Sequence, residues 1–243
     1  LTLAEYVTER GPLPADLGAA LGVGLTEALK EIHQADILHR DLKPSNILLG
    51  ADGPRVIDFG LAALTEAPSD LTRTSEIIGT PVCMAPEQAH ASKELTEAVD
   101  VYSLGAVLLF AMTGHYPYQR PTASAMLFAI TDLATPPDLS GLPDILVKAV
   151  GDMLAKAPTG RPTLNEVAAA IAEVLADGGL TDPGTASQWL AGLTYVERDD
   201  DPTPPAPPRA RPPRLPENPR VPSALVQQIA DTLRRDYDRD AGF

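Results

Sequence analysis

The sequence predicts a mainly helical domain that carries one small β-hairpin. Three observations support this fold class. Leucines recur at helical spacing early in the chain, two short apolar runs soon afterwards flank a turn-forming stretch, and the pattern is again helical from Val99 onward. Hydrophobic residues make up 44% of the 243 residues, which is enough to build a substantial core.

The first two helices are predicted from helix-breaking residues and from apolar periodicity. A short helix over Leu1–Arg10 should end at the Gly-Pro-Leu-Pro stretch that follows it. Asp16 then offers an N-cap for a longer amphipathic helix, whose apolar stripe is Leu17, Leu21, Leu25, Leu29 and Ile32. Three glycines inside this helix each cost about 1 kcal/mol relative to alanine. We expect close packing against a neighbour to offset that cost.

A hairpin is predicted next. Its strands are the apolar runs Asn46–Leu49 and Arg55–Asp58, and residues 50–54 (GADGP) form the turn. The threonine-rich stretch Thr65–Thr80 reads as a long loop, and long loops in compact domains usually serve a function.

The end of the domain is predicted from a capping box over Thr163–Glu166, which should open a last helix ending near Ala176. We therefore expect a domain over 1–176, a linker over 177–222 and a short amphipathic helix within 223–243. Ten of the twenty-one residues 202–222 are proline, so we expect a disordered tail there. Its Pro-x-x-Pro spacings leave a proline-motif binding partner open as a second interpretation.

Composition excludes several functions. A net charge of −14 argues against nucleic-acid binding and against a basic membrane-surface patch. The single cysteine, Cys83, cannot form an intrachain disulfide, and we expect a cytoplasmic protein. The longest apolar run, Val101–Met112, is shorter than the ~20 residues of a membrane span, so we expect a buried core helix and no transmembrane segment. Because the chain begins at Leu1 rather than Met, we expect a fragment.

Three motifs carry the chemistry. They are HRDLKPSN at His39–Asn46, DFG at Asp58–Gly60 and APE at Ala85–Glu87, in that order along the chain. Together, and with the hairpin between the first two, they resemble the signature of the eukaryotic-type protein serine/threonine kinases, most closely the bacterial ones. The resemblance covers Leu1–Ala176 and implies the helical C-terminal lobe of a kinase, with the hairpin at its active face.

The resemblance implies ATP and Mg²⁺ as cofactors and a protein as substrate. Asp41 would be the catalytic base, because phosphoryl transfer needs a carboxylate that takes the hydroxyl proton. Lys43 would neutralise the γ-phosphate and, within Asp-Leu-Lys-Pro, indicates serine and threonine as acceptors. Asn46 and Asp58 flank the hairpin and would bind Mg²⁺ through oxygen. Leu48 would line the ATP site, and Thr80 would support Asp41 and Lys43 from the substrate-binding loop.

Regulatory residues are implied as well. In the family, an arginine at the position of Arg40 grips a phosphate on the activation loop. Thr72 and Thr74 lie where bacterial relatives carry phosphorylated threonines, and a phosphate can order a loop by pairing with arginine.

Four further positions are implied to be structural. Glu87 and Arg161 should form a buried ion pair, although each taken alone reads as a surface charge. Asp100 should tether the catalytic loop, with a helix N-cap as its simpler interpretation. Cys83 replaces a tyrosine that is usual there, and a tolerated substitution is favoured over a redox role.

The N-terminal lobe of a kinase is not predicted in these residues. Lys30 is the only lysine before Asp41, and it falls on the long helix rather than on a strand. Gly22-Val23-Gly24 lacks the third glycine of a phosphate-covering loop. We therefore expect the chain alone to be inactive. A non-catalytic kinase-like binding module or truncated pseudokinase stays open as the alternative, and a small-molecule phosphotransferase is a third, disfavoured by the APE motif.

Overall fold

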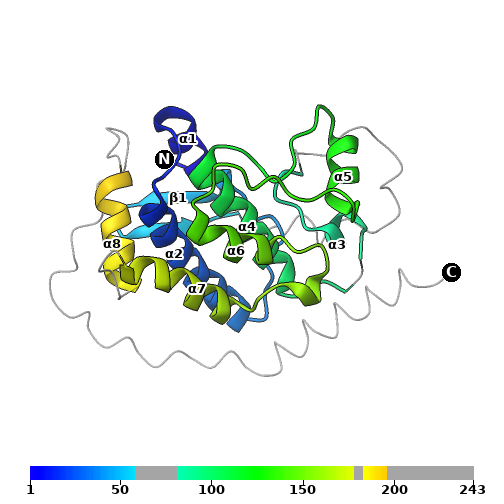
Figure 1. Ribbon diagram of the computed structural model, residues 1–243. Coiled ribbons are helices and arrows are strands. Elements are labelled where there is room, and N and C mark those ends of the chain that lie inside the picture. Colours follow the sequence, from blue (N-terminus) through cyan, green and yellow to red (C-terminus); the bar gives the residue numbers. More distant parts are fainter. Residues whose placement is uncertain (59–80, 93, 178–182, 196–243) are drawn as a thin grey trace, which may run out of the picture. The chain divides into compact units, whose positions relative to one another are not determined.

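The computed structural model describes residues 1–58, 81–92, 94–177 and 183–195 (Figure 1). The chain divides into Leu1–Glu197 and Arg198–Phe243, and the second unit, with the predicted proline-rich tail and helix, lies outside the described residues. Described elements are mainly helices with one two-stranded sheet, as predicted. In chain order they are α1 (Leu3–Arg10), α2 (Ala15–Gln34), η1 (Pro44–Asn46), β1 (Ile47–Gly50), β2 (Gly53–Val56), α3 (Pro86–Ala89), α4 (Ala98–Thr113), α5 (Ala123–Thr131), α6 (Asp144–Met153), η3 (Pro158–Gly160), α7 (Leu164–Asp177) and α8 (Pro183–Thr194).

The starts of the first two helices differ in how they are capped. Thr2 opens α1 with a capping box, in which its hydroxyl accepts from the Glu5 N–H and its own N–H donates to the Glu5 carboxylate. The prediction that Asp16 caps α2 is wrong, because Pro14 occupies the N-cap with φ −57° and ψ 159°. Proline is already fixed near this φ, so the helix begins two residues earlier than predicted. Asp16 instead lies in the first turn of the helix. Its negative charge there interacts favourably with the positive end of the helix dipole.

Close packing explains the glycines of α2. A Cβ at Gly22 would lie 2.8 Å from Cδ1 of Ile171 on α7, and one at Gly24 would lie 2.7 Å from Cγ of Pro54 on β2. Both distances are shorter than side chains tolerate. The glycines therefore let α7 and the hairpin approach the backbone of α2, as the sequence predicts.

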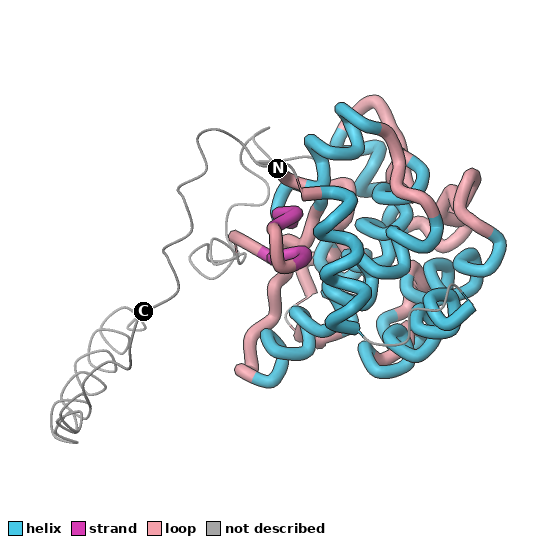
Figure 2. The backbone as a smooth tube through the Cα atoms, turned by 90° about the vertical axis from the view of Figure 1, so that its left-hand side faces the viewer, coloured by secondary structure: helices cyan, strands magenta, loops and turns pink. Residues whose placement is uncertain are grey.

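The hairpin forms as predicted, with slightly shifted bounds. β1 and β2 are antiparallel, and Ile47 pairs with Val56 while Gly50 pairs with Gly53. Gly53 has φ 117°, a conformation that a residue with a side chain rarely adopts, so the strands extend to a two-residue turn. Figure 2 shows the two strands lying against helices.

The apolar run of α4 is the core of the domain. All residues from Val99 to Met112 are buried, which confirms the prediction of a core helix. α2 and α6 both contact α4, so this helix is covered from more than one side. Among the described residues, no helix is long and apolar enough to cross a membrane.

A further helix, α8, lies within the range 177–222 that the sequence was expected to use as a linker. Ala186, Leu190 and Ala191 of α8 are buried, and the helix contacts α2 and both strands. Its glycines and few large apolar residues give a weak periodic signal, so only tertiary contact reveals it. The described fold therefore continues beyond the predicted boundary at residue 176.

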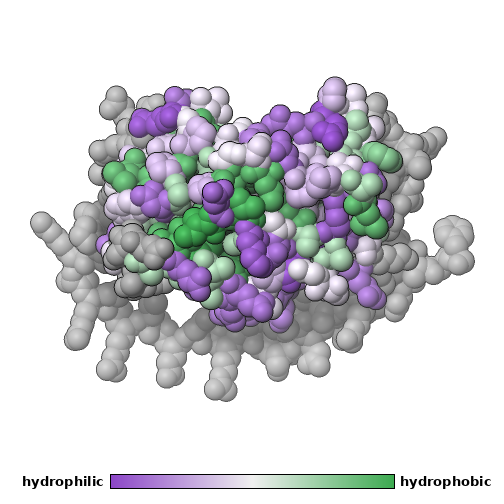
Figure 3. Space-filling model, viewed as in Figure 1, coloured by the Kyte–Doolittle hydropathy of each residue, from purple (hydrophilic) through white to green (hydrophobic). Residues whose placement is uncertain are grey.

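The core leaves some apolar side chains on the surface, as folded domains usually do. Figure 3 shows hydrophobic side chains gathered over α6, where Ile145 is 54% exposed. Phe128 on α5 and Leu133 just after it are also exposed. These positions lie on elements away from the hairpin and the catalytic motif.

Candidate active site

The residues predicted for catalysis meet where the chain passes from α2 into the hairpin. Lys43 Nζ lies 2.7 Å from Asp41 Oδ2. Asn46 Nδ2 donates to the same oxygen at 3.2 Å and to the Asp41 carbonyl at 2.9 Å. Asn46 is buried while the Asp41 side chain is half exposed. Contacts with Lys43 and Asn46 therefore fix the Asp41 side chain, and its carboxylate stays accessible to solvent.

The two oxygens of Asp41 have different surroundings. Oδ2 is held by Lys43 and Asn46. Oδ1 has no hydrogen-bond partner among the described residues. An ionised carboxylate accepts hydrogen bonds only, so Oδ1 is the atom able to accept a proton from an incoming hydroxyl. The geometry thus suits a positioned base.

Asp100 of α4 holds the loop that precedes Asp41. Its side chain is fully buried and accepts the N–H groups of His39 and Arg40, both at 2.9 Å. His33 Nε2, at the end of α2, adds a third contact at 2.7 Å. A buried carboxylate is costly unless hydrogen-bonded, and here both oxygens are engaged. The prediction of a tether is confirmed, whereas the N-cap of α4 is Glu97.

Two residues beside the site have a left-handed backbone without being glycine. Arg40 has φ 64° and Asp58 has φ 54°. Such conformations cost about 1–3 kcal/mol each and persist where surrounding contacts fix them. At Arg40 those contacts are the bond from its N–H to Asp100 and the Gln88 amide, which donates to the Arg40 carbonyl at 2.7 Å. The strain lies directly before the predicted base and at the predicted metal ligand.

The Arg40 side chain suits the predicted regulatory role. Its Nε is buried and has no hydrogen-bond partner within the described ranges. A buried donor on a cation calls for an anionic or carbonyl acceptor. Thr72, Thr74 and Thr80 lie outside the described residues, so their predicted roles stay predictions.

The hairpin brings the predicted metal ligands to its open end. The Ile57 N–H donates to the Asn46 carbonyl at 2.9 Å. Asn46, just before β1, therefore lies opposite the residue that precedes Asp58. The Asn46 amide nitrogen donates to Asp41, so the ligand atom would be the amide oxygen, which accepts a long 3.5 Å bond from the Ser45 hydroxyl. The Asp58 carboxylate is exposed. Two oxygen ligands fit Mg²⁺, which keeps several waters. Among the described residues there is no group of three or more His, Cys, Asp or Glu residues placed to bind a metal.

The Leu48 side chain lies on the face of β1 opposite the core. Its neighbours Ile47 and Leu49 are 0% and 3% exposed, while Leu48 is only partly buried and pairs with Arg55. Alternate residues of a strand point to opposite faces. Leu48 is thus available on the face that the resemblance assigns to ATP, and its contact with ATP stays a prediction.

The ion pair between α3 and the segment before α7 forms as predicted. Arg161 donates to both oxygens of Glu87, at 2.6 and 2.8 Å, and its side chain is fully buried. The same guanidinium donates to the carbonyls of Ala98, Ala155 and Lys156 and lies 4.9 Å from the Tyr102 ring centroid. Every side of the cation is satisfied, so this pair braces α3 against α4.

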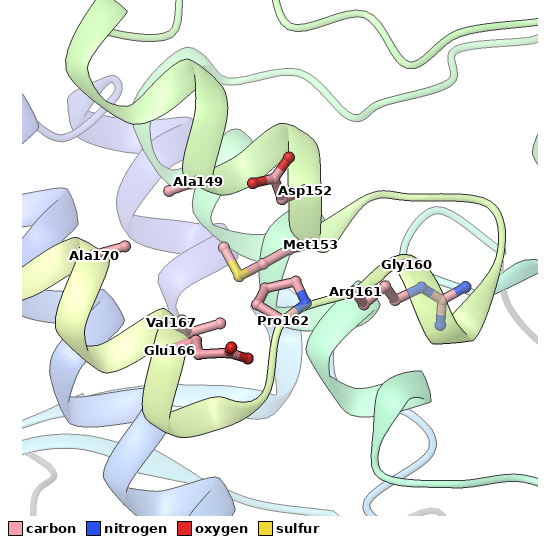
Figure 4. A pocket seen from close by; sticks show the side chains of 9 residues that line it. All are labelled: Ala149, Asp152, Met153, Gly160, Arg161, Pro162, Glu166, Val167 and Ala170. Carbon is pink, nitrogen blue, oxygen red and sulfur yellow. The ribbon is translucent and has the colours of Figure 1, made fainter.

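A cavity of about 410 Å³ lies next to this brace, between α6 and α7. Figure 4 shows Met153 and Val167 in its lining, with the carboxylates of Asp152 and Glu166 nearby and the Arg161 guanidinium extending away. None of the predicted catalytic or ATP-binding residues lines it. It is therefore separate from the candidate active site.

Cys83 is buried, which fits the interpretation as a tolerated substitution. Burial, with a smaller contribution from the Asp41 charge, raises the pKa of the thiol far above its usual range. A thiol that stays protonated is a poor nucleophile. Ser103 donates to the Cys83 carbonyl at 2.8 Å and fixes this segment to α4.

Two supporting residues were missed by the sequence analysis. His33 contacts Asp100 across 67 positions, and Gln88 contacts Arg40 across 48 positions. Neither pair has a local pattern that could identify it. Only the packing of α2 and α3 against the catalytic loop brings them together.

Known proteins place the chain in a family. The model for the protein kinase domain matches residues 2–171. The serine/threonine-protein kinase AfsK of Streptomyces coelicolor is 46% identical over 189 residues, which cover 78% of this chain and 23% of that relative. AfsK of Streptomyces griseus is 41% identical over 230 residues, covering 92% of this chain and 28% of the relative. The probable serine/threonine-protein kinase PkwA of Thermomonospora curvata is 44% identical over 168 residues, covering 69% and 22%.

The chain thus spans less than a third of the length of these curated relatives. The matched region contains the catalytic loop, the hairpin and the Glu87–Arg161 brace described above. Sequence similarity and site geometry lead to one conclusion: the chain belongs to the serine/threonine protein kinase family.

Proposed function

We propose that the chain provides the phosphoryl-transfer machinery of a protein serine/threonine kinase. The observation that carries this proposal is the Asp41 carboxylate, held at Oδ2 by Lys43 and Asn46 and without a hydrogen-bond partner at Oδ1 among the described residues. A transfer with a loose transition state needs positioning and charge neutralisation more than covalent chemistry. The anchored loop supplies the first and Lys43 the second.

In the proposed reaction, Asp41 Oδ1 takes the proton of a serine or threonine hydroxyl of a protein. The hydroxyl oxygen forms a bond to the γ-phosphorus of ATP, the bond from that phosphorus to the β–γ bridging oxygen breaks, and ADP leaves. Lys43 balances negative charge that develops on the transferred group. The Asp100 tether keeps Asp41 in place throughout, because it fixes the two residues before the base.

Mg²⁺ would be held by the Asn46 amide oxygen and the Asp58 carboxylate. When bound, the ion neutralises phosphate charge. Asp58 lies two residues beyond the end of β2 and has a left-handed backbone. Arg40, with Thr72 and Thr74, is proposed to regulate the site by binding phosphothreonine.

The proposal is tested by Asp41→Asn in the full-length protein that contains this chain. Asparagine keeps the shape but cannot accept the proton, so transfer to a protein substrate should fall about 10²–10⁴-fold. The control is Asp52→Asn, since Asp52 is exposed in the hairpin turn and forms an ion pair with Arg55. Phosphate transfer from labelled ATP is the readout. Near-normal transfer by Asp41→Asn, with the control also normal, contradicts the assignment.

A non-catalytic kinase-like module is the second candidate. The observation that favours it is the position of Lys30 on α2, where its Nζ atom pairs with Glu27 Oε1 at 2.8 Å. In the described residues the only strands are β1 and β2, so no strand-borne lysine grips phosphates there. Full-length protein that binds a protein partner but never transfers phosphate would support this candidate.

A further inference from the structure

The peptide that leads into Asp41 is held on both sides. The Arg40 carbonyl accepts a hydrogen bond from the Gln88 side-chain amide at 2.7 Å. The Asp41 N–H belongs to the same planar peptide and donates to the His39 carbonyl at 2.9 Å. The preceding peptide is fixed separately, because the Arg40 N–H donates to Asp100. Both peptide planes that meet at the Arg40 Cα atom are therefore anchored, and Gln88 is the side chain that anchors the second one.

The other end of the Gln88 amide is used as well. Its Oε1 atom accepts the N–H of Ala85 at 3.1 Å, at the start of α3. One neighbour is a donor and the other is an acceptor, so the side chain between them must both accept and donate. An ionised glutamate would keep the bond from Ala85 but would face the Arg40 carbonyl without a hydrogen. Glutamine meets both requirements, and in one orientation only.

α3 is held in place independently of Gln88. The preceding residue, Glu87, forms the buried ion pair with Arg161, and α3 also contacts α5. Ser103 of α4 donates to the Cys83 carbonyl, just before α3, at 2.8 Å. The Gln88 amide therefore extends from an anchored helix to the backbone of the catalytic loop.

The contact matters because the backbone of Arg40 is left-handed, with φ 64°, although the residue is not glycine. Such a conformation persists only where surrounding contacts fix it. Without the bond from Gln88, the peptide between Arg40 and Asp41 would be free to rotate toward a commoner conformation. The Cα atom of Asp41 belongs to that planar unit, so the rotation would move the proposed base.

We propose that Gln88 is a positioning residue for Asp41, and that it makes the position of the base depend on the placement of segment 81–85 and α3. The inference rests on the proposed function, because it takes Asp41 as the base. Gln88 acts through the Arg40 backbone and not on the reacting atoms. A kinase in which this segment is displaced would lose the Gln88 contact and the fixed base together.

Gln88→Glu separates the two contacts, since glutamate keeps the acceptor for Ala85 and loses the donor to Arg40. In the 243-residue chain labelled with ¹⁵N and ¹³C, we expect the Arg40 carbonyl and Asp41 amide resonances to move while the Ala85 amide resonance keeps its position. Gln88→Met removes both contacts, so the Ala85 amide resonance should move as well. Circular dichroism checks that both variants are folded. Arg40 and Asp41 resonances that stay unchanged in both variants would overturn the proposal.

In the full-length protein, Gln88→Glu should lower kcat about 10- to 100-fold and leave the KM for ATP within about twofold. Gln119→Glu makes the same change of charge at an exposed position and should leave both constants unchanged. A kcat for Gln88→Glu within about twofold of the Gln119→Glu value would contradict the positioning role. An unaltered protein that never transfers phosphate would contradict the proposed function instead, and the resonance comparison would still decide whether Gln88 fixes the peptide before Asp41.

Discussion

At the scale of single residues, the best-satisfied charge is Arg161. It is fully buried and uses its donors on Glu87 and three backbone carbonyls. Removing one member of a buried ion pair leaves the other uncompensated, which costs about 3–5 kcal/mol. The Glu87 side chain is 12% exposed, so water relieves part of that cost.

We therefore expect Glu87→Gln to lower the free energy of unfolding by about 2–4 kcal/mol. Urea denaturation followed by circular dichroism measures it. Glu94→Gln, an exposed carboxylate outside this network, is the control and should change stability by less than about 0.5 kcal/mol. Equal midpoints for Glu87→Gln and the unaltered chain would show that α3 does not need this brace.

Residue patterns predicted the local contacts of the catalytic loop better than the long-range contacts. The motif at residues 39–46 predicted that Asp41, Lys43 and Asn46 come together, because they are close in sequence and a turn suffices to gather them. The partners of His33 and Gln88 were not predictable, since they depend on helix packing. Asp16 failed as a cap because Pro14 already had the required backbone.

At the scale of elements, the glycines of α2 set how closely α7 can approach. Gly22→Ala should raise helix propensity by about 1 kcal/mol, yet place a methyl group 2.8 Å from Ile171 Cδ1. Overpacking of this kind costs about 1–3 kcal/mol, so we expect a net loss of stability in thermal unfolding. Ile171→Val removes Cδ1 and should recover part of the loss when combined with Gly22→Ala.

Gly192→Ala on α8 is the matched control, because nothing lies within 4 Å of a Cβ at that position. Helix propensity then acts alone, and the melting temperature should rise slightly. A lower melting temperature for Gly192→Ala together with a higher one for Gly22→Ala would contradict this explanation.

The capping box of α7 makes part of the stability depend on pH. Thr163 donates through its N–H and its hydroxyl to Glu166, both at 2.8 Å. These bonds hold the pKa of Glu166 below its usual value near 4.5. A carboxyl whose pKa is lowered by folding contributes stability above its unfolded pKa, and loses that contribution as pH falls through the folded value.

We expect Glu166→Gln to lower the urea midpoint at pH 6 relative to the unaltered chain. The difference between the two should shrink as pH falls below about 4.5. Glu173→Gln, an exposed acid further along α7, serves as the control. A difference that stays constant from pH 6 to pH 3 would mean that the carboxylate charge plays no part in the cap.

Element boundaries show what the sequence could and could not predict. Periodicity placed α2 and α4, and the turn residues placed the hairpin, because each signal is local. α8 was missed, since its buried residues are small and its stability comes from contact with α2 and the strands. Its position beyond residue 176 shows that composition alone placed the start of the linker too early.

At the scale of the whole molecule, we expect the 243-residue chain alone to transfer little phosphate. It holds the proposed base and metal ligands, but its described residues offer no glycine-rich strand loop over ATP. Positioning supplies up to about 7–11 kcal/mol of a barrier, so a partly held ATP reacts slowly. The measurement is turnover of the purified chain with Mg-ATP and a protein substrate.

Asp58→Ala in the same chain is the control for a metal-dependent background. Turnover comparable with that of the full-length protein, lost in Asp58→Ala, would show that the C-terminal lobe positions ATP by itself. If the unaltered 243-residue chain turns over no faster than its Asp58→Ala variant, the result agrees with the expectation.

The position of α2 has a consequence for synthesis on the ribosome. α2 contacts α4, α7, α8 and β2, and α8 begins roughly 150 residues after α2 ends. At about 5–20 residues per second, translation takes roughly 8–30 s to supply that last partner. During this interval the nascent chain carries a completed helix whose apolar face is only partly covered. Such a segment is a natural client for a chaperone near the exit tunnel, and α2 completes its packing only after α8 has been made.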